Sequence, residues 1–278
     1  MKFSLVMATL GRSVEVERLF DSLAAQTYRN FDLIVIDQNE DSRVRDLVTR
    51  FSDRMSIIYL RSAKGLSRAR NVGLKHVFGD LVAFPDDDCW YPPDLLQFVV
   101  DHFSRDAQLE GLTGCSINER GVLSQGRWLS ERVRVTRKNL FTCATSYTIF
   151  LRADAARLAG EFDEALGVGS GTRWGAGEET NYLLRVIDAD RKVCYDPELR
   201  VRHPEPVVEM DERTYSRARL YNRGFGRVLG LNRFPAHTVL YHVGRAMAGG
   251  AVSLARLDVK RARYHWIAAT QRFLGWVD

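Results

Sequence analysis

The first 105 residues alternate short apolar runs with segments whose apolar residues recur every three or four positions, the period of an amphipathic helix. The apolar runs are residues 3–8, 31–36, 55–60 and 81–84. Nearly continuous apolar runs of this length are typical of strands buried on both faces, as in a parallel sheet covered by helices. Consecutive parallel strands are joined by right-handed crossovers, which the intervening helices supply. The sequence therefore predicts an α/β fold with a Rossmann-like, doubly wound and mostly parallel sheet.

Three consecutive carboxylates, Asp86, Asp87 and Asp88, follow the fourth apolar run. They stand at the carboxyl end of a predicted strand, where open α/β sheets bind ligands in a crevice. Carboxylates this close repel one another unless a cation lies among them. Oxygen ligands suit Mg²⁺ or Mn²⁺ bound together with substrate phosphates. An acidic turn that caps the next helix is the alternative interpretation, and it would suffice for an isolated triplet.

Polar residues also stand where the other predicted strands end. Thr9 and Arg12 follow the first strand, Asp37 ends the second, and Arg68 and Arg70 lie beyond the third. In this topology the strand ends lie side by side along one edge of the sheet. Any one of these residues alone would be an ordinary loop or surface side chain. Together, acids at two strand ends beside several cations predict a site for a nucleoside diphosphate.

Beyond residue 105 the alternation weakens, although residues 109–117 and 141–151 are predicted strands. The most glycine-rich segment, residues 167–180, lacks the G-x-G-x-x-G spacing and does not open the first βα unit, which argues against a Rossmann cofactor site. We expect a mobile loop there that delivers Glu178 and Glu179 to the start of a helix. Acids at a helix start also favour the helix dipole, which is the structural alternative for this pair.

The chain of 278 residues carries a net charge of +5. This mild excess fits a phosphate-bearing substrate or an anionic membrane surface, and it is too small to indicate nucleic acid. The four cysteines are widely spaced without a C-x-x-C pair, so the sequence predicts neither a zinc site nor disulfides. A reducing cytosol is the expected compartment, and the apolar part of the N-terminus is too short for a signal peptide.

Residues 209–278 change character and form a basic, helical region. An arginine-rich helix is predicted first, and a second pattern opens at Pro235 with its apolar residues along one stripe. No stretch reaches the ~20 apolar residues that span a bilayer. Two interpretations remain open for these C-terminal amphipathic helices. They lie in the interface of an anionic membrane, or they pack on the rest of the chain or on a second copy in a homodimer.

Five motifs, in this order, resemble the family 2 glycosyltransferases, which have the GT-A fold. The motifs are residues 8–12 (Ala-Thr-Leu-Gly-Arg), 35–37 (Val-Ile-Asp), 65–73 (Gly-Leu-Ser-Arg-Ala-Arg-Asn-Val-Gly), 84–88 (Phe-Pro-Asp-Asp-Asp) and 177–180 (Gly-Glu-Glu-Thr). They span most of residues 1–205. The resemblance implies a GT-A catalytic domain over residues 1–208, with a nucleotide-binding half at 1–105 and an acceptor half at 106–208. The helical region at 209–278 follows it.

The resemblance implies a transferase that moves a sugar from a nucleotide-sugar donor to an acceptor hydroxyl, with inversion at the anomeric carbon and with Mn²⁺ or Mg²⁺. The acceptor would be a saccharide or a lipid-linked saccharide in polysaccharide or glycolipid assembly. The protein would work in the cytoplasm or peripherally on the cytoplasmic face of the membrane.

Carried over by position, the resemblance also implies roles for individual residues. Asp88 would bind the metal, and His203 would complete the metal shell. Glu179 would be the general base, at a position where the family usually has the Asp of a Glu-Asp pair, so its side chain is one methylene longer. Nucleotide binding would fall to Thr9, Arg12, Asp37, Arg68, Arg70 and Asp87, and acceptor binding to Trp174 and Glu178.

Two other functions fit parts of the sequence. A nucleotidyltransferase shares the sheet and the acidic metal site, but it would usually carry a glycine-rich, lysine-containing loop after the first strand. Residues 9–12 match such a loop poorly. An inactive, membrane-associated scaffold in polysaccharide assembly is a non-enzymatic alternative, although acids at every expected site position argue against it.

Overall fold

The computed structural model of the protein describes residues 1–205 and 209–278. The chain forms two compact units. The first comprises Met1–Lys64, Arg68–Glu161 and the described part of Tyr182–Pro206, and the second comprises Gly65–Ser67, Phe162–Asn181 and the described part of Val207–Asp278. The domain boundary predicted after residue 208 lies outside the described residues.

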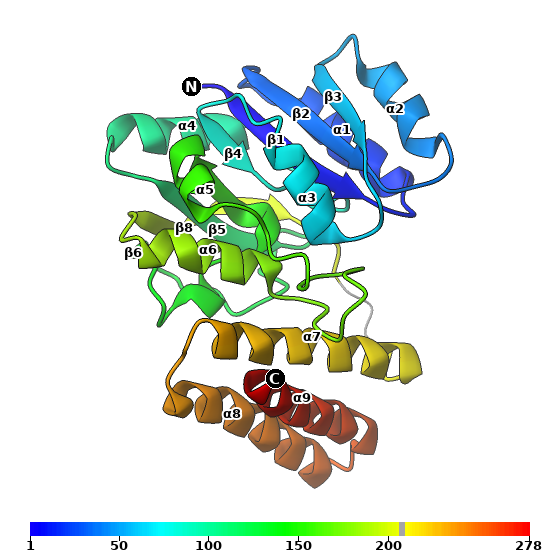
Figure 1. The fold of residues 1–278 in the computed structure, drawn as a ribbon, viewed down its shortest axis with the longest axis vertical. Coiled ribbons are helices and arrows are strands. Elements are labelled where there is room, and N and C mark those ends of the chain that lie inside the picture. Colours follow the sequence, from blue (N-terminus) through cyan, green and yellow to red (C-terminus); the bar gives the residue numbers. More distant parts are fainter. Residues whose placement is uncertain (206–208) are drawn as a thin grey trace. The chain divides into compact units, whose positions relative to one another are not determined.

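The first unit is built on an eight-stranded sheet with the order β3-β2-β1-β4-β7-β5-β8-β6 (Figure 1). Its parallel half contains β1 (Phe3–Thr9), β2 (Phe31–Asp37), β3 (Ser56–Arg61) and β4 (Leu81–Ala83). β1 pairs in parallel with β2 on one side and with β4 on the other. The carboxyl ends of these strands therefore meet at one edge of the sheet, where Thr9 and Asp37 are aligned partners.

The other half of the sheet is mixed and contains β5 (Gly111–Ile117), β6 (Val133–Arg134), β7 (Ile149–Arg152) and β8 (Val193–Arg202). β5 and β8 run parallel, whereas β7 is antiparallel to its neighbours β4 and β5. The strand predicted over residues 141–151 is wrong for most of its length. Residues Leu140–Thr142 and Ser146–Thr148 form short 3-10 helices, the second closed by reciprocal hydrogen bonds between Thr145 and Thr148.

Among the described residues, six α-helices belong wholly or partly to the first unit: α1 (Val14–Ala24), α2 (Arg43–Phe51), α3 (Leu66–Leu74), α4 (Leu95–Arg105), α5 (Ala153–Ala159) and α6 (Glu178–Asp188). Every residue of β1 and β2 is buried, as expected for strands covered on both faces. α3 lies so close to these strands that a Cβ at Gly73 would overlap the side chains of Val6 and Ile36. The architecture confirms the predicted α/β fold with a mostly parallel sheet.

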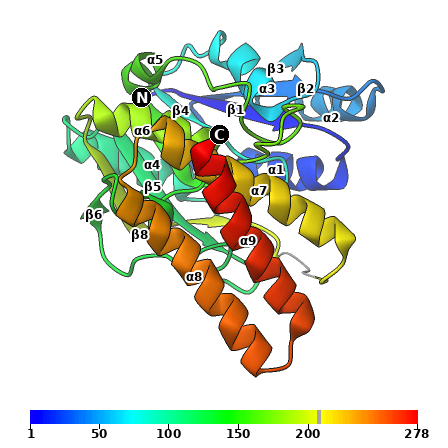
Figure 2. The same cartoon turned by 60° about the horizontal axis from the view of Figure 1, so that its bottom comes forward.

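The described part of the second unit contains three further helices, α7 (Glu212–Leu231), α8 (Ala236–Ala255) and α9 (Val259–Val277). α9 packs against both α7 and α8, and Figure 2 shows α8 and α9 as an antiparallel pair. Glycines bring α7 and α9 into backbone contact, because a Cβ at Gly226 would overlap the carbonyl group of Arg272. Within the described ranges, none of the helices combines the length and the apolar character needed to cross a membrane.

Candidate active site

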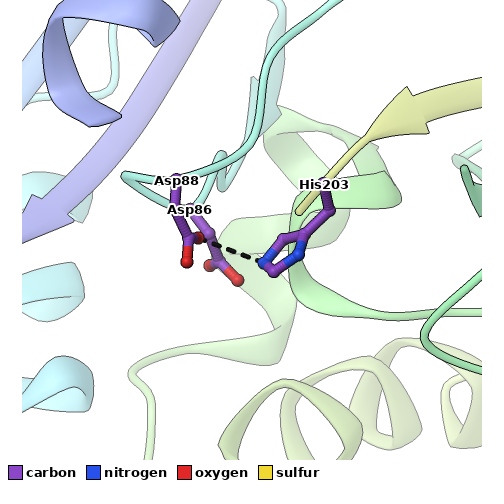
Figure 3. A group of neighbouring side chains, drawn as sticks. All are labelled: Asp86, Asp88 and His203. Carbon is purple, nitrogen blue, oxygen red and sulfur yellow. Dashed lines mark ion pairs between the residues drawn. The ribbon is translucent and has the colours of Figure 1, made fainter. Parts of the chain in front are cut away.

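Two carboxylates and an imidazole converge at the carboxyl edge of the sheet in the first unit (Figure 3). Asp86 and Asp88 lie in the turn after β4, and His203 directly follows β8. One potential ligand atom from each residue lies within 4.8 Å of the others, and His203 Nε2 is 3.1 Å from Asp88 Oδ1. Two carboxylate oxygens and an imidazole nitrogen form a donor set that fits Mn²⁺ or Mg²⁺.

The third acid of the turn faces the end of β1. Asp87 accepts a hydrogen bond of 2.8 Å from Thr9 Oγ1. Arg12 forms an ion pair with Asp87, and its Nη2 lies 2.7 Å from Asp88 Oδ2. Burial raises the pKa of Asp87. Burial would also raise the pKa of Asp88, but His203 and Arg12 outweigh it and lower that pKa.

The structure thus brings together several of the residues predicted from the sequence, namely Thr9, Arg12, Asp87, Asp88 and His203. It adds Asp86, to which the resemblance assigns no role. The available signal was the run of three consecutive acids directly after a buried strand. Which of the three meet depends on the turn, in which the Cys89 backbone nitrogen donates to the Asp86 carbonyl oxygen over 3.1 Å.

Asp86 is held by Ser146 and by a buried arginine. Ser146 Oγ donates hydrogen bonds to both carboxylate oxygens over 3.0 and 3.1 Å, and Arg70 Nη2 lies 3.0 Å from Oδ1. Burial raises the pKa of Asp86 to about 6, against the opposing effects of the Arg70 charge and the Ser146 hydrogen bond. Arg70 is 1% exposed. This predicted nucleotide-binding residue therefore acts as a countercharge for Asp86 in this structure.

The orientation of His203 directs its Nε2 at the carboxylates. Its ring stacks on Tyr147 with the centroids 4.9 Å apart. Its Nδ1 lies 2.9 Å from the carbonyl oxygen of Pro204 and 3.2 Å from Gln125 Nε2. Burial alone would lower the pKa of His203, but the hydrogen bond and charge of Asp88 raise it. Partners that fix Nδ1 and leave Nε2 for a metal are typical of metal-binding histidines.

Asp37 ends β2 and is fully buried, and both of its carboxylate oxygens accept hydrogen bonds. The Tyr59 hydroxyl donates to Oδ2 over 2.6 Å, and Asn39 donates to Oδ1 through its backbone and side-chain nitrogens over 2.8 and 2.7 Å. Asn39 in turn accepts a hydrogen bond of 2.6 Å from the backbone nitrogen of Gly11. Asp37 therefore fixes the loop after β1. Arg68, on α3, is exposed.

Glu178 and Glu179 open α6 and belong to the second unit. Glu178 is buried against Gly167, where a Cβ would lie 3.0 Å from Glu178 Oε2 and 3.2 Å from Ser67 Oγ. Gly167 also has a φ of 96°, which favours glycine. Glu179 is half-buried. The two acids therefore differ in exposure: Glu178 is buried within the second unit, whereas Glu179 is half-buried.

The glycine-rich loop that contains Trp174 is fastened within the second unit. Trp174 Nε1 donates a hydrogen bond of 2.8 Å to Asp278, and the Arg227 guanidinium lies 4.6 Å from the centre of its ring. The backbone nitrogen of Gly175 donates to the carbonyl oxygen of Leu220 over 3.1 Å. These contacts attach the loop, expected to be mobile, to α7 and to the end of α9.

Comparison with known proteins finds relatives that are named glycosyltransferases. The sequence model of the family described as "Glycosyl transferase family 2" matches residues 4–158. The UDP-Glc:alpha-D-GlcNAc-diphosphoundecaprenol beta-1,3-glucosyltransferase WfgD of Escherichia coli is 35% identical over 89 residues, which are 31% of this chain and 35% of that protein. The poly(ribitol-phosphate) beta-N-acetylglucosaminyltransferase TarS of Staphylococcus aureus is 28% identical over 131 residues, or 44% and 22% of the two chains. The matches thus cover about a third or less of these relatives.

Solved structures share the fold over nearly the whole chain. Residues 1–349 of S. aureus TarS align with a TM-score of 0.64 at 15% identity, covering 98% of this chain and 92% of that one. The mannosyltransferase PcManGT of Pyrobaculum calidifontis, in complex with GDP-Man and Mn²⁺, aligns with a TM-score of 0.64 at 14% identity, covering 98% and 87%. These similarities confirm the GT-A fold. Since the family's sequence model spans more than half of the chain, the chain belongs to glycosyl transferase family 2.

Proposed function

We propose that the protein is a metal-dependent transferase that moves a sugar from a nucleotide-sugar donor to an acceptor hydroxyl, with inversion. The observation that carries this proposal is the convergence of Asp86, Asp88 and His203 at the carboxyl edge of the sheet. Displacement of a nucleoside diphosphate from an anomeric carbon requires charge stabilisation on the leaving group. It also requires a group that takes the proton of the attacking hydroxyl.

Asp86, Asp88 and His203 would hold Mn²⁺ or Mg²⁺. When bound, the ion stabilises negative charge on the leaving diphosphate. The Arg12 side chain is 42% exposed and lies against two of the acids, so it would be available to bind phosphate oxygens of the donor. The mannosyltransferase with GDP-Man and Mn²⁺ supports this combination of nucleotide and metal.

The nucleoside would lie over the ends of β1 and β2, where Thr9 and Asp37 are aligned. Asp37 and its partner Asn39 shape the loop that would receive the base. Asp87, fixed by Thr9, would face the ribose. Arg68, exposed on α3, would supply a further cation to the nucleotide.

Glu179 would be the general base. α6 is one continuous helix whose first residues belong to the second unit and whose later residues belong to the first. Glu178 is enclosed, which leaves Glu179 as the more accessible carboxylate of the pair. It would take the proton of the acceptor hydroxyl while the new glycosidic bond forms and the bond to the diphosphate breaks. Trp174 and Glu178 would shape the acceptor side.

The acceptor would be a saccharide or a lipid-linked saccharide in polysaccharide or glycolipid assembly. The name of WfgD specifies a diphosphoundecaprenol-linked sugar, and that of TarS specifies poly(ribitol-phosphate). Both names support a carbohydrate polymer or its lipid-linked precursor. The protein would then work peripherally at the cytoplasmic face of a membrane.

The test is thermal unfolding with UDP, GDP and dTDP, each with and without Mn²⁺. A ligand that binds the folded state raises the unfolding temperature, so one nucleoside diphosphate should do so only with the metal. Asp88→Ala should abolish this shift, because it removes a ligand, while exposed Asp46→Ala on α2 should retain it.

Donor turnover then separates the remaining functions. Release of a nucleoside diphosphate with sugar transfer supports the proposal. Release of pyrophosphate from a nucleoside triphosphate would identify a nucleotidyltransferase instead. A protein that responds to none of the nucleotides, with or without metal, would be a scaffold.

A further inference from the structure

The turn that joins α8 to α9 exposes several apolar side chains. We call residues 252–261 the hairpin tip. Leu254, Leu257 and Val259 are 57%, 88% and 67% exposed. Leu257 also has a φ of 57°, in the left-handed region where glycine or asparagine would be expected. Neither packing nor backbone conformation accounts for a leucine at this position.

Cations alternate with these apolar residues along the hairpin tip. Arg256, Lys260 and Arg261 are exposed and form no ion pair with the described residues. Asp258 is the one acid of the tip, and it accepts a hydrogen bond of 2.9 Å from the backbone nitrogen of Arg261 as the cap of α9. The tip therefore combines exposed apolar side chains with exposed cations that form no ion pair with the described residues.

The positive charge of the chain is concentrated in the C-terminal helices. Residues 209–278 contain twelve of the 40 Lys and Arg residues and five of the 35 Asp and Glu residues, so their net charge is +7. The remaining residues, 1–208, therefore have a net charge of −2. A partner attracted by charge alone would meet the C-terminal helices.

The tip is held by packed helices. Ser253 is buried, its hydroxyl donates to the carbonyl oxygen of Gly249 over 2.9 Å, and its own carbonyl oxygen accepts a hydrogen bond of 2.9 Å from the Asp258 backbone nitrogen. Gly249 lies where a Cβ would overlap the ring of His265. These contacts therefore hold the backbone of the tip, which lies at the bottom of Figure 2 where α8 and α9 join.

We propose that the hairpin tip docks on an anionic phospholipid bilayer, with Leu254, Leu257 and Val259 among the headgroups and the cations on lipid phosphates. Apolar groups bordered by Lys and Arg suit that interface. A second copy of the chain is the less favourable occupant, because two such tips would repel each other. The inference deepens the proposed function, since it rests on a lipid-linked acceptor and names the element that brings the protein to it.

The test is sedimentation of the full-length protein with phosphatidylcholine vesicles, with and without phosphatidylglycerol. Binding should require the anionic lipid and weaken with salt. Leu257→Gly is the sharpest variant, because glycine relieves the left-handed backbone and leaves the fold intact. It should lower vesicle binding severalfold without lowering the unfolding temperature. Phe78→Ser, which removes an apolar side chain that is 75% exposed in the first unit, should leave binding unchanged.

Replacing Arg256, Lys260 and Arg261 together by Gln should lower binding by on the order of 100-fold at low salt, at about fivefold per cation. The proposal would be overturned if the wild-type protein did not sediment with anionic vesicles. It would also be overturned if Leu257→Gly and the triple Gln variant both bound the vesicles as well as the wild-type protein does. Lipid-free dimerisation that Leu257→Gly abolishes would also overturn it, in favour of a second copy. Hydrolysis of the nucleotide-sugar donor, measured without lipid, separates failure of the membrane proposal from failure of the proposed transferase function. Leu257→Gly should not change this hydrolysis.

Discussion

Asp86, Asp87 and Asp88 have the same side chain but face different neighbours. Burial raises the pKa of Asp86 and of Asp87. Asp88 is also buried, yet its hydrogen bond to His203 and the charge of Arg12 lower its pKa. Because the pKa of Asp86 is raised to about 6, close to neutral pH, this residue should govern the pH dependence of metal binding.

We expect metal affinity to fall as pH falls through about 6, the pKa of Asp86. A metal binds the deprotonated carboxylate, so one proton lowers apparent affinity about tenfold for each pH unit below that value. The raised pKa of His203 acts in the same direction, because a neutral imidazole is the ligand. Calorimetric titration of Mn²⁺ with a nucleoside diphosphate present would measure this.

The Ser146→Ala variant distinguishes the protonation of Asp86 from that of His203. It removes a hydrogen bond that lowers the pKa of Asp86, so the midpoint should move to higher pH. Ser52→Ala, at an exposed serine after α2, is the matched control and should not move it. An affinity that stays constant from about pH 5 to 7 would contradict the assignment of Asp86 as a ligand.

Glu179→Gln should lower sugar transfer by about 10²–10⁴-fold, since it keeps the size of the side chain and removes the proton acceptor. Nucleotide and metal binding should stay unchanged, because the residues assigned to them lie in the first unit. Glu178→Gln should be the milder variant in transfer. A dead Glu178→Gln beside an active Glu179→Gln would shift the assignment by one residue, and full activity in both would refute it.

At the scale of elements, the spacing of apolar residues predicted the strands and helices whose burial depends on that spacing. The buried β1 and β2 and the apolar face of α1 follow directly from the spacing of apolar residues. The 3-10 helices within residues 140–148 do not follow from local pattern, because an apolar run does not show that Thr145 and Thr148 close a turn by hydrogen bonds to each other. That turn sets Ser146 on Asp86 and Tyr147 on His203.

The same limit applies to the site. Which strand ends carry polar residues can be seen in the sequence, but which side chains meet cannot. Asp86 and His203 are 117 positions apart and meet only because β4 and β8 point to the same edge of the sheet. The burial of Arg70, which makes it a countercharge, likewise depends on tertiary packing.

Contact between α7 and α9 should be sensitive to a single methyl group. Gly226→Ala would place a Cβ against the Arg272 carbonyl group, and overpacking of this kind costs about 1–3 kcal/mol. Gly244→Ala on α8 is the matched control, because no atom lies near its new methyl group. It should stabilise the protein by about 0.5–1 kcal/mol through helix propensity. Urea unfolding of both variants measures the difference, and equal stabilities would contradict the close packing.

At the scale of the molecule, all four cysteines are buried and lie in the first unit. Burial raises the pKa of each thiol, that of Cys143 to about 11. The native protein should therefore react very slowly with thiol reagents at neutral pH, and rapid reaction should require opening of the first unit. Spectroscopic counting of modified thiols would show this, and one fast equivalent in native protein would contradict it.

The second unit is assembled from three stretches of chain, and this has an evolutionary consequence. Gly175 is hydrogen-bonded to Leu220, a Cβ at Gly177 would overlap Val228, and Asn181 pairs with Asn232. Changes in the loop before α6 should therefore require matching changes in the C-terminal helices. Recombination that exchanges the helices alone would break these pairs, so we expect the two stretches to have diverged together, with covariation across natural relatives at these positions.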